Sequence, residues 1–246
     1  MCALSMELLL LAGVVALGFT VETALGFGAT LVAVSLGSGF LPLELILPAF
    51  VPVNMALSLL IVVRQRDQVE LRFLLGRLLP FMVLGLPLGF VAFSALPELV
   101  LRRIFGAFLL ALIGVDVWQL LRPAARRGPL PRAAEVLLLL VGGAIHGAFG
   151  TGGPIAVYVS KQALAEKGSF RATLSALWLL LNTLVVAGYA FRGLLGADSA
   201  ARSLSMLPAL GLGLILGELI HRRVNTELFR RLVLGMLFVV ALSLFR

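Results

Sequence analysis

The sequence predicts an all-α polytopic membrane protein whose two homologous halves form an inverted repeat. Three observations predict this fold. The 246 residues are 61% apolar and 13% charged, and the mean hydropathy of +1.09 lies far outside the range of soluble globular domains. The apolar residues form runs that approach the roughly 20 residues needed to span a bilayer. Finally, one glycine-rich pattern interrupts such a run in each half, which indicates that the halves are related.

The glycine-rich pattern reads ETALGFGATLVAV over residues 22–34 and HGAFGTGGPIAVY over residues 146–158. A constant offset aligns three positions of the two copies: Ala24 with Ala148, Gly26 with Gly150, and Gly28 with Gly152. Each copy begins with one ionisable side chain, Glu22 in the first and His146 in the second. Glycine lets the backbone leave helical geometry, so each copy is expected to break a helix.

In the first half, an apolar arm over residues 6–20, a break over 22–28 and an arm over 29–40 predict a broken-helix hairpin. Neither arm is long enough to span a bilayer alone, so the apex of the hairpin must be buried in protein or face water. Three full transmembrane helices are expected after it, over residues 43–63, 73–96 and 99–121. The first transmembrane repeat therefore covers residues 1–121.

A basic linker over residues 122–132 separates the halves, and the second transmembrane repeat covers residues 133–246. Its hairpin is expected from an arm over 133–145, a break over 146–154 and an arm that ends near position 159. Three full helices follow, over residues 170–191, 203–220 and 226–245. Each half therefore combines one broken-helix hairpin with three full transmembrane helices.

The relationship between the halves can be tested by counting. With an offset of 128 and no gap, residues 54–103 laid on 182–231 give 11 identities in 50 positions. The leucine-rich composition alone explains four of these identities. Several of the others match polar, proline or glycine residues: Asn54 with Asn182, Arg64 with Arg192, Pro80 with Pro208, Gly85 with Gly213, and Gly89 with Gly217. Two homologous halves are therefore expected.

The basic residues indicate how the halves face. If each broken element returns to its starting side, each half crosses the membrane an odd number of times and the second half is inverted. One side then collects 15 of the 20 Lys and Arg residues, in segments 64–77, 122–132, 161–171 and 222–231. If each broken element crosses the membrane instead, the split is 11 against 9. The positive-inside rule favours the inverted repeat, with a cytoplasmic linker and both termini outside the cytoplasm.

Composition argues against several other classes of protein. The net charge of +8 is spread over the ends of apolar segments and forms no single patch, so nucleic acid is not an expected partner. Cys2 is the only cysteine and the two histidines are isolated, so we expect no disulfide framework, metal site or other cofactor. An enzyme would need a cluster of catalytic groups. None is visible, and we do not expect an enzyme.

The glycine-rich breaks have two interpretations. In one, their small residues only permit close helix packing. In the other, they are discontinuous helices that meet near the midplane, where N-terminal N–H groups and a positive dipole face an anion. The second interpretation makes ten residues candidates for substrate binding: Gly26, Gly28, Thr30, Asn54, His146, Gly150, Thr151, Gly152, Gly153 and Asn182.

The polar side chains also have alternatives. Glu22 and His146 are candidates for proton coupling, because an ionisable group inside a membrane is costly unless it is used or paired. The alternative for both is a hydrated position at the end of a short arm. Asn54 and Asn182 either line the cavity or bond carbonyl groups of neighbouring backbone. Arg64 and its counterpart in the second half are expected to extend to the two opposite interfaces.

Three features recur in both halves: a glycine-rich break after the first arm, a short apolar arm, and an Asn-bearing helix that ends in Arg. They occupy residues 26–28 and 150–153 for the breaks, and 54–64 and 182–192 for the helices. With these features, essentially the whole sequence resembles the sulfite exporter TauE/SafE family of membrane transporters. The resemblance implies passive or ion-coupled movement of small sulfur-containing anions, such as sulfite or sulfonates, across a bacterial inner membrane.

The predicted function is therefore secondary transport of a small anion by a multi-pass protein of the bacterial inner membrane. The expected partners are the anion, the lipid bilayer and, as a candidate coupling ion, the proton. An anion channel of similar inverted-repeat architecture is the alternative. Saturable flux with counterflow would favour the transporter, whereas linear flux of high conductance would favour the channel.

Overall fold

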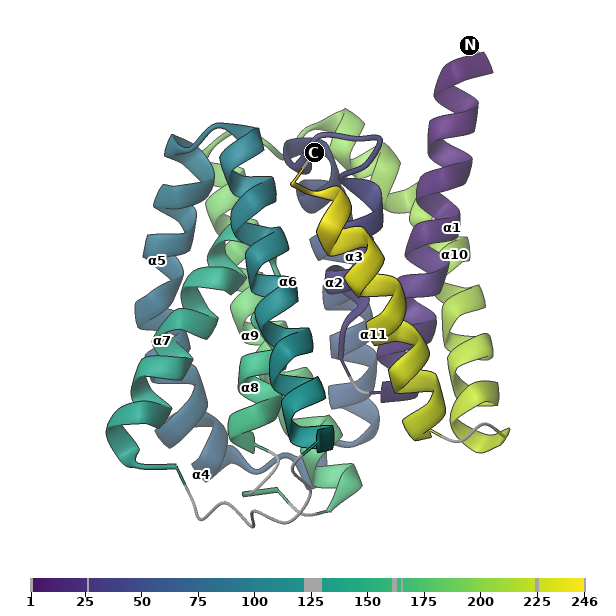
Figure 1. Ribbon diagram of the computed structural model, residues 1–246. Helices are drawn as coiled ribbons and strands as arrows, with labels where there is room; N and C mark the ends of the chain where they lie inside the picture. The colour runs from purple at the N-terminus through teal and green to yellow at the C-terminus, as the bar shows by residue number, and fades with distance from the viewer. Residues whose placement is uncertain are drawn as a thin grey trace.

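The computed structural model describes residues 2–25, 27–121, 130–160, 163–164, 166–223 and 226–245. Its regular secondary structure is helical, and the described residues include no strand. The long helices pack side by side in one bundle (Figure 1). Five described helices are long and apolar enough to cross a membrane: Leu43–Arg64, Leu71–Ala95, Arg132–Phe149, Gly168–Phe191 and Ala197–Ile220. The all-α, multi-pass membrane fold expected from the sequence is therefore confirmed.

The helices of the first half are α1 (Cys2–Leu25), α2 (Ala29–Gly37), α3 (Leu43–Arg64), α4 (Leu71–Phe73), α5 (Leu79–Ala95) and α6 (Glu98–Leu121). A 3₁₀ turn over Arg66–Gln68 follows α3, and a π-helical turn over Leu74–Leu78 leads into α5. The helices of the second half are α7 (Arg132–Phe149), α8 (Gly153–Ser160), α9 (Lys167–Phe191), α10 (Ala197–Arg223) and α11 (Thr226–Ser243).

Three helix boundaries predicted from the sequence were wrong. Helix α1 continues to Leu25 and α7 continues to Phe149, so Glu22 and His146 lie in the last turns of helices, not within the breaks. The residues after each ionisable group are small or apolar, and nothing in them ends a helix before the glycines. Helix α10 begins at Ala197, earlier than position 203, because the Ser199 hydroxyl accepts the N–H of Gly196 in a capping interaction.

Glycines with positive φ mark both breaks. Gly28 precedes α2 with a φ of 111°, and Gly150 follows α7 with a φ of 64°. This region of backbone conformation strains any residue with a Cβ atom. After each break the chain folds back, so that α2 packs against α1 and α8 packs against α7.

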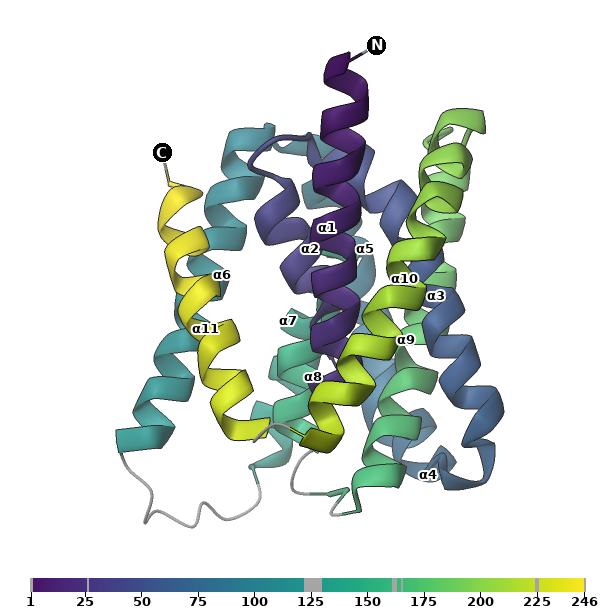
Figure 2. The ribbon, with the colours of Figure 1, turned by 90° about the vertical axis from the view of Figure 1, so that its right-hand side faces the viewer.

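The two hairpins enter the bundle from opposite ends. In Figures 1 and 2, the start of α1 and the end of α11 lie at the upper end, whereas α4, the end of α6 and the start of α7 lie at the lower end. Helix α1 therefore descends towards the first break, and α7 ascends towards the second (Figure 1). Both breaks consequently reach the interior of the bundle.

Glycines allow two helix pairs to pack with their backbones in contact. A Cβ atom placed on Gly89 of α5 would lie 2.0 Å from the carbonyl oxygen of Ala144 in α7. A Cβ atom on Gly217 of α10 would lie 2.7 Å from the carbonyl oxygen of Thr20 in α1. Gly89 and Gly217 are the positions that the repeat aligns. Each half therefore packs one of its helices against the first arm of the other half.

Helices α3 and α9 pack against each other between the two hairpins. Both helices are apolar, yet each carries one buried asparagine, Asn54 in α3 and Asn182 in α9. Buried polar side chains need hydrogen-bond partners. The partners of these two asparagines define the candidate site.

Candidate functional site

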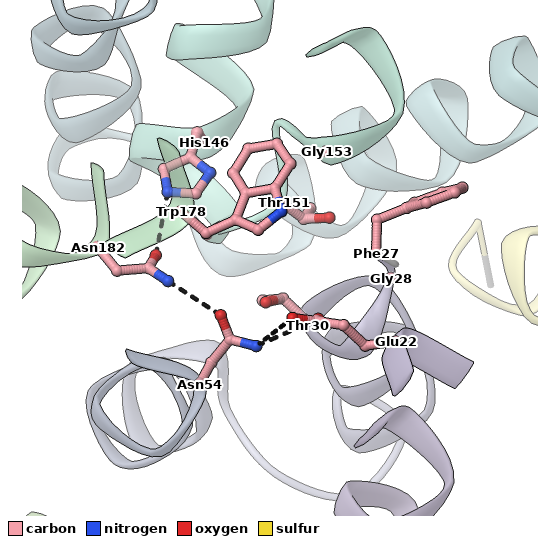
Figure 3. Close-up of a pocket in the computed structure, with 11 residues that line it drawn as sticks. Glu22, Phe27, Gly28, Thr30, Asn54, His146, Thr151, Gly153, Trp178 and Asn182 are labelled. Carbon is pink, nitrogen blue, oxygen red and sulfur yellow. Dashed lines mark hydrogen bonds between the residues drawn. The ribbon is translucent and has the colours of Figure 1, made fainter. Parts of the chain in front are cut away.

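A small cavity lies where the two breaks meet α3 and α9 (Figure 3). Its lining comes from both halves of the chain: Glu22, Phe27, Gly28, Thr30, Asn54, His146, Gly150, Thr151, Gly153, Trp178 and Asn182. The cavity therefore brings together most of the residues proposed from the sequence. Gly152 lies beside the lining, in contact with His146. Gly26 lies outside the described residues.

A continuous set of hydrogen bonds, which we call the polar chain, joins the ionisable residues of the two halves. Its members are Glu22, Asn54, Asn182 and His146, and they are only 1–7% exposed. His146 Nε2 lies 3.0 Å from Asn182 Oδ1. Asn182 Nδ2 donates to Asn54 Oδ1 at 3.0 Å. Asn54 Nδ2 donates to the two carboxylate oxygens of Glu22 at 3.1 and 3.2 Å (Figure 3).

Each end of the polar chain also accepts a backbone N–H group. Ala29, the first residue of α2, donates to Glu22 Oε2 at 3.0 Å. Gly152, immediately before α8, donates to His146 Nδ1 at 3.2 Å. The ionisable residue of each half is therefore tied to the N-terminal end of the short helix that follows it.

The hydrogen bond from Gly152 determines which nitrogen of the His146 imidazole carries the proton. A nitrogen that accepts a hydrogen bond carries no proton, so Nδ1 is bare and Nε2 donates to Asn182. All donors in the polar chain then point from His146 towards Glu22. The carboxylate of Glu22 accepts every bond that it makes, as an ionised carboxylate must.

Two lining residues were not proposed from the sequence. Trp178 stacks on His146, with ring centroids 5.9 Å apart and an interplanar angle of 14°. It lies one helical turn before Asn182 and therefore on the same face of α9, a spacing that the sequence already contains. Phe27 stands inside the first break, where the second break has Thr151. The two halves of the cavity wall are therefore chemically unequal.

The space inside the cavity is very small. Its volume is about 20 Å³, which is room for roughly one water molecule. An anion of several atoms enters only if the walls move apart. Among the described residues, no group of three or more His, Cys, Asp or Glu side chains is placed to hold a metal ion.

Comparison with known proteins identifies the family. The model of the family described as Sulfite exporter TauE/SafE matches residues 9–244, which include both breaks and the whole polar chain. No curated protein and no solved structure matches the chain. The family match covers nearly every residue, and the chain belongs to the sulfite exporter TauE/SafE family.

Proposed function

We propose that this protein is a secondary transporter that moves small sulfur-containing oxyanions or sulfonates through the cavity between its two breaks. The family is one of membrane transporters for sulfite and related compounds, which implies a small anionic substrate and a surrounding bilayer and is consistent with a protein that is not an enzyme. The polar chain is the observation that carries the proposal. A buried polar network inside an apolar membrane bundle is costly unless it serves a substrate or an ion.

The cavity has the chemistry to receive an oxyanion. The side chains of Asn54 and Asn182 and the imidazole of His146 supply N–H donors, and Thr30 and Thr151 add hydroxyl groups to the lining. The break at Gly152 presents a backbone N–H at the start of a helix, where the dipole is positive. An anion that enters would compete with the carboxylate of Glu22 for these donors. Proton occupancy of Glu22 is therefore suited to control anion binding.

Glu22 and His146 both remain candidates for the coupled proton, and the geometry favours Glu22. A second proton on His146 would have to enter at Nδ1, which already accepts the N–H of Gly152. A proton on Glu22 adds no charge to the imidazole, because both amides can reverse and His146 then moves its one proton from Nε2 to Nδ1. We assign the proton exchange to Glu22 and the orientation of the polar chain to His146.

The proposal includes an inverted repeat, with residues 1–121 and 133–246 as its halves. Three observations support it: the hairpins enter the bundle from opposite ends (Figure 1), Asn54 bonds its own repeat counterpart, and aligned glycines make the contacts between the halves. Rocking of one half against the other would open the cavity first to one side and then to the other. The basic linker over 122–132 then faces the cytoplasm of a bacterial inner membrane.

The inverted topology predicts which engineered cysteines react from each side. In a Cys2→Ser background, Asp67→Cys and Ala163→Cys should be labelled from the cytoplasm, because both positions are exposed near the basic connections. Pro97→Cys and Ala197→Cys are exposed at the opposite end and should react only with reagent added outside. The measurement is labelling of intact cells by an impermeant maleimide before and after permeabilisation. Labelling of Asp67→Cys and Ala163→Cys from opposite sides would exclude the inverted repeat.

Anion flux into liposomes tests the function itself. We expect the purified full chain to take up sulfite or a sulfonate with saturable kinetics and to accelerate exchange when the same anion is trapped inside. A screen with sulfite, sulfate, thiosulfate, sulfonates, carboxylates and halides identifies the substrate class. Flux that rises linearly with anion concentration and shows no counterflow would favour the alternative, an anion channel. Uptake of carboxylates or halides alone would reject sulfur-containing anions as the substrate.

A further inference from the structure

A second and much larger pocket lies between α1, α3, α9 and α10, with a volume of about 750 Å³. Two guanidinium groups line it, those of Arg64 at the end of α3 and Arg171 near the start of α9. The one carboxylate in its lining belongs to Glu218, which already takes part in another interaction. Most of the remaining lining is aliphatic, so the pocket carries a net positive charge within apolar walls.

Three buried polar atoms of this pocket have no hydrogen-bond partner among the described residues. Within the described ranges, Thr23 Oγ1, Gln65 Oε1 and Arg171 Nε are buried and make no hydrogen bond. Neither Arg64 nor Arg171 forms a salt bridge with a described residue. A buried guanidinium N–H without an acceptor is costly, and guanidinium groups pair well with oxyanions. An oxyanion in the pocket would supply the acceptor that Arg171 Nε–H lacks.

The pocket adjoins the cavity. Thr23, which lines the pocket, directly follows Glu22, which lines the cavity. Both arginines belong to the basic segments 64–77 and 161–171, and the lower ends of α3, α9 and α10 in Figure 2 surround this region. The end of α1 therefore contributes one residue to the pocket and its neighbour to the cavity.

The two ends of the bundle differ in the arginines that they present at positions aligned by the repeat. The repeat aligns Arg64 with Arg192, whose guanidinium lies over the ring of Phe93 at 5.4 Å and is thereby engaged. It aligns Arg171 with Leu43, which is buried and apolar. The other end of the molecule therefore has no equivalent pair of arginines at the aligned positions. A site of this kind serves one side of the membrane.

We propose that this pocket, the arginine vestibule, is a second anion-binding site that holds a sulfite or sulfonate ion on the cytoplasmic side before it enters the cavity. The substrate class rests on the proposed function. A lipid phosphate offers the same oxyanion chemistry. The position of Thr23 directly after Glu22 favours the transported anion, because a headgroup held at the bundle surface has no need of contacts beside the cavity.

Thermal unfolding of the purified full chain in detergent, titrated with sulfite at constant ionic strength, separates the two sites. In the Asn54→Ala/Asn182→Ala variant the cavity has lost both amide donors of the polar chain, and we expect sulfite still to raise the unfolding temperature. Adding Arg64→Gln and Arg171→Gln should raise the half-saturating sulfite concentration at least about tenfold, as expected for lost charge-assisted hydrogen bonds. The matched control is Arg192→Gln in the same background, which should leave the titration unchanged.

Several outcomes would overturn the vestibule. One is the absence of any sulfite effect once both asparagines are replaced, and another is an unchanged titration after the loss of Arg64 and Arg171. In nanodiscs, abolition of the sulfite effect by phosphatidylglycerol but not by phosphatidylcholine would assign the pocket to a lipid phosphate instead. If the combined variant does not fold, Arg171→Lys replaces it, and an unchanged half-saturating concentration in that variant also contradicts the proposal. These unfolding titrations do not depend on flux, so the proposed function can fail separately in the liposome screen.

Discussion

Replacing Asn182 by leucine is expected to reduce anion flux at least about a hundredfold while the protein remains in the membrane. The substitution removes the acceptor for His146 Nε2 and the donor to Asn54 Oδ1, and both atoms stay buried. Each unsatisfied buried group costs about 1–3 kcal/mol. A total near 3 kcal/mol in the state that binds the anion corresponds to a factor of roughly a hundred in affinity.

The control for this prediction is Thr183→Val, on the next residue of the same helix. The Thr183 hydroxyl is exposed and donates only to the carbonyl of Leu179 in its own helix, at 2.7 Å. We expect its flux to match that of the wild-type protein. The measurement is sulfite or sulfonate uptake by liposomes that contain equal amounts of monodisperse protein. If Asn182→Leu keeps more than a tenth of the wild-type flux, the polar chain does not lie on the transport route.

The repeat made Asn54 and Asn182 predictable as a pair, but it left two interpretations open. A gap-free offset finds both residues in apolar helices, and the sequence allowed either a cavity wall or bonds to neighbouring backbone. In the structure they bond each other at 3.0 Å. In the proposed inverted repeat, residues near the two-fold axis would meet their own counterparts. The sequence shows which residues correspond but not how far they lie from the axis.

The breaks were predictable to within one helical turn. Positive φ at Gly28 and Gly150 agrees with the expectation that glycines end the regular helix. Glu22 and His146 were placed in the breaks because each stands at the head of its copy of the glycine-rich pattern, yet both lie in the last turn of a helix. Their partners explain the difference. Backbone N–H groups of the following short helices reach back to each side chain, which lets it stay buried within the helix.

The arginine vestibule could not be predicted from the sequence. Arg64 was expected at a membrane interface because it ends an apolar helix, and Arg171 has no counterpart in the repeat. Their proximity arises because the end of α3, the start of α9 and the end of α10 meet at one end of the bundle. Packing between helices so distant in sequence carries no local signal.

The direction of the polar chain connects proton binding at one break with the backbone of the other. While Glu22 is ionised it can only accept, so Asn54 and Asn182 present their NH₂ groups towards it. A proton on Glu22 makes it a donor, and both amides then have to turn over. His146 must in turn accept at Nε2 and carry its proton at Nδ1, which expels the N–H of Gly152. That N–H, at the start of α8, becomes free to bind an anion.

Anion uptake should therefore require a protonated Glu22. When Glu22 is replaced by glutamine, uptake should no longer depend on pH. With methanesulfonate, whose charge does not change between about pH 5 and 8, wild-type uptake should fall by up to about tenfold per pH unit once Glu22 is ionised, as one linked proton dictates. While Nδ1 of His146 accepts the N–H of Gly152, this imidazole takes up no second proton. The Glu22→Gln variant should take up methanesulfonate at the acid-limit rate at every pH, because glutamine is neutral and both donates and accepts hydrogen bonds.

The matched control is Glu44→Gln, which removes an exposed carboxylate in the first turn of α3 and should keep the wild-type pH profile. A Glu22→Gln variant with the wild-type slope would show that the transported proton does not bind at Glu22.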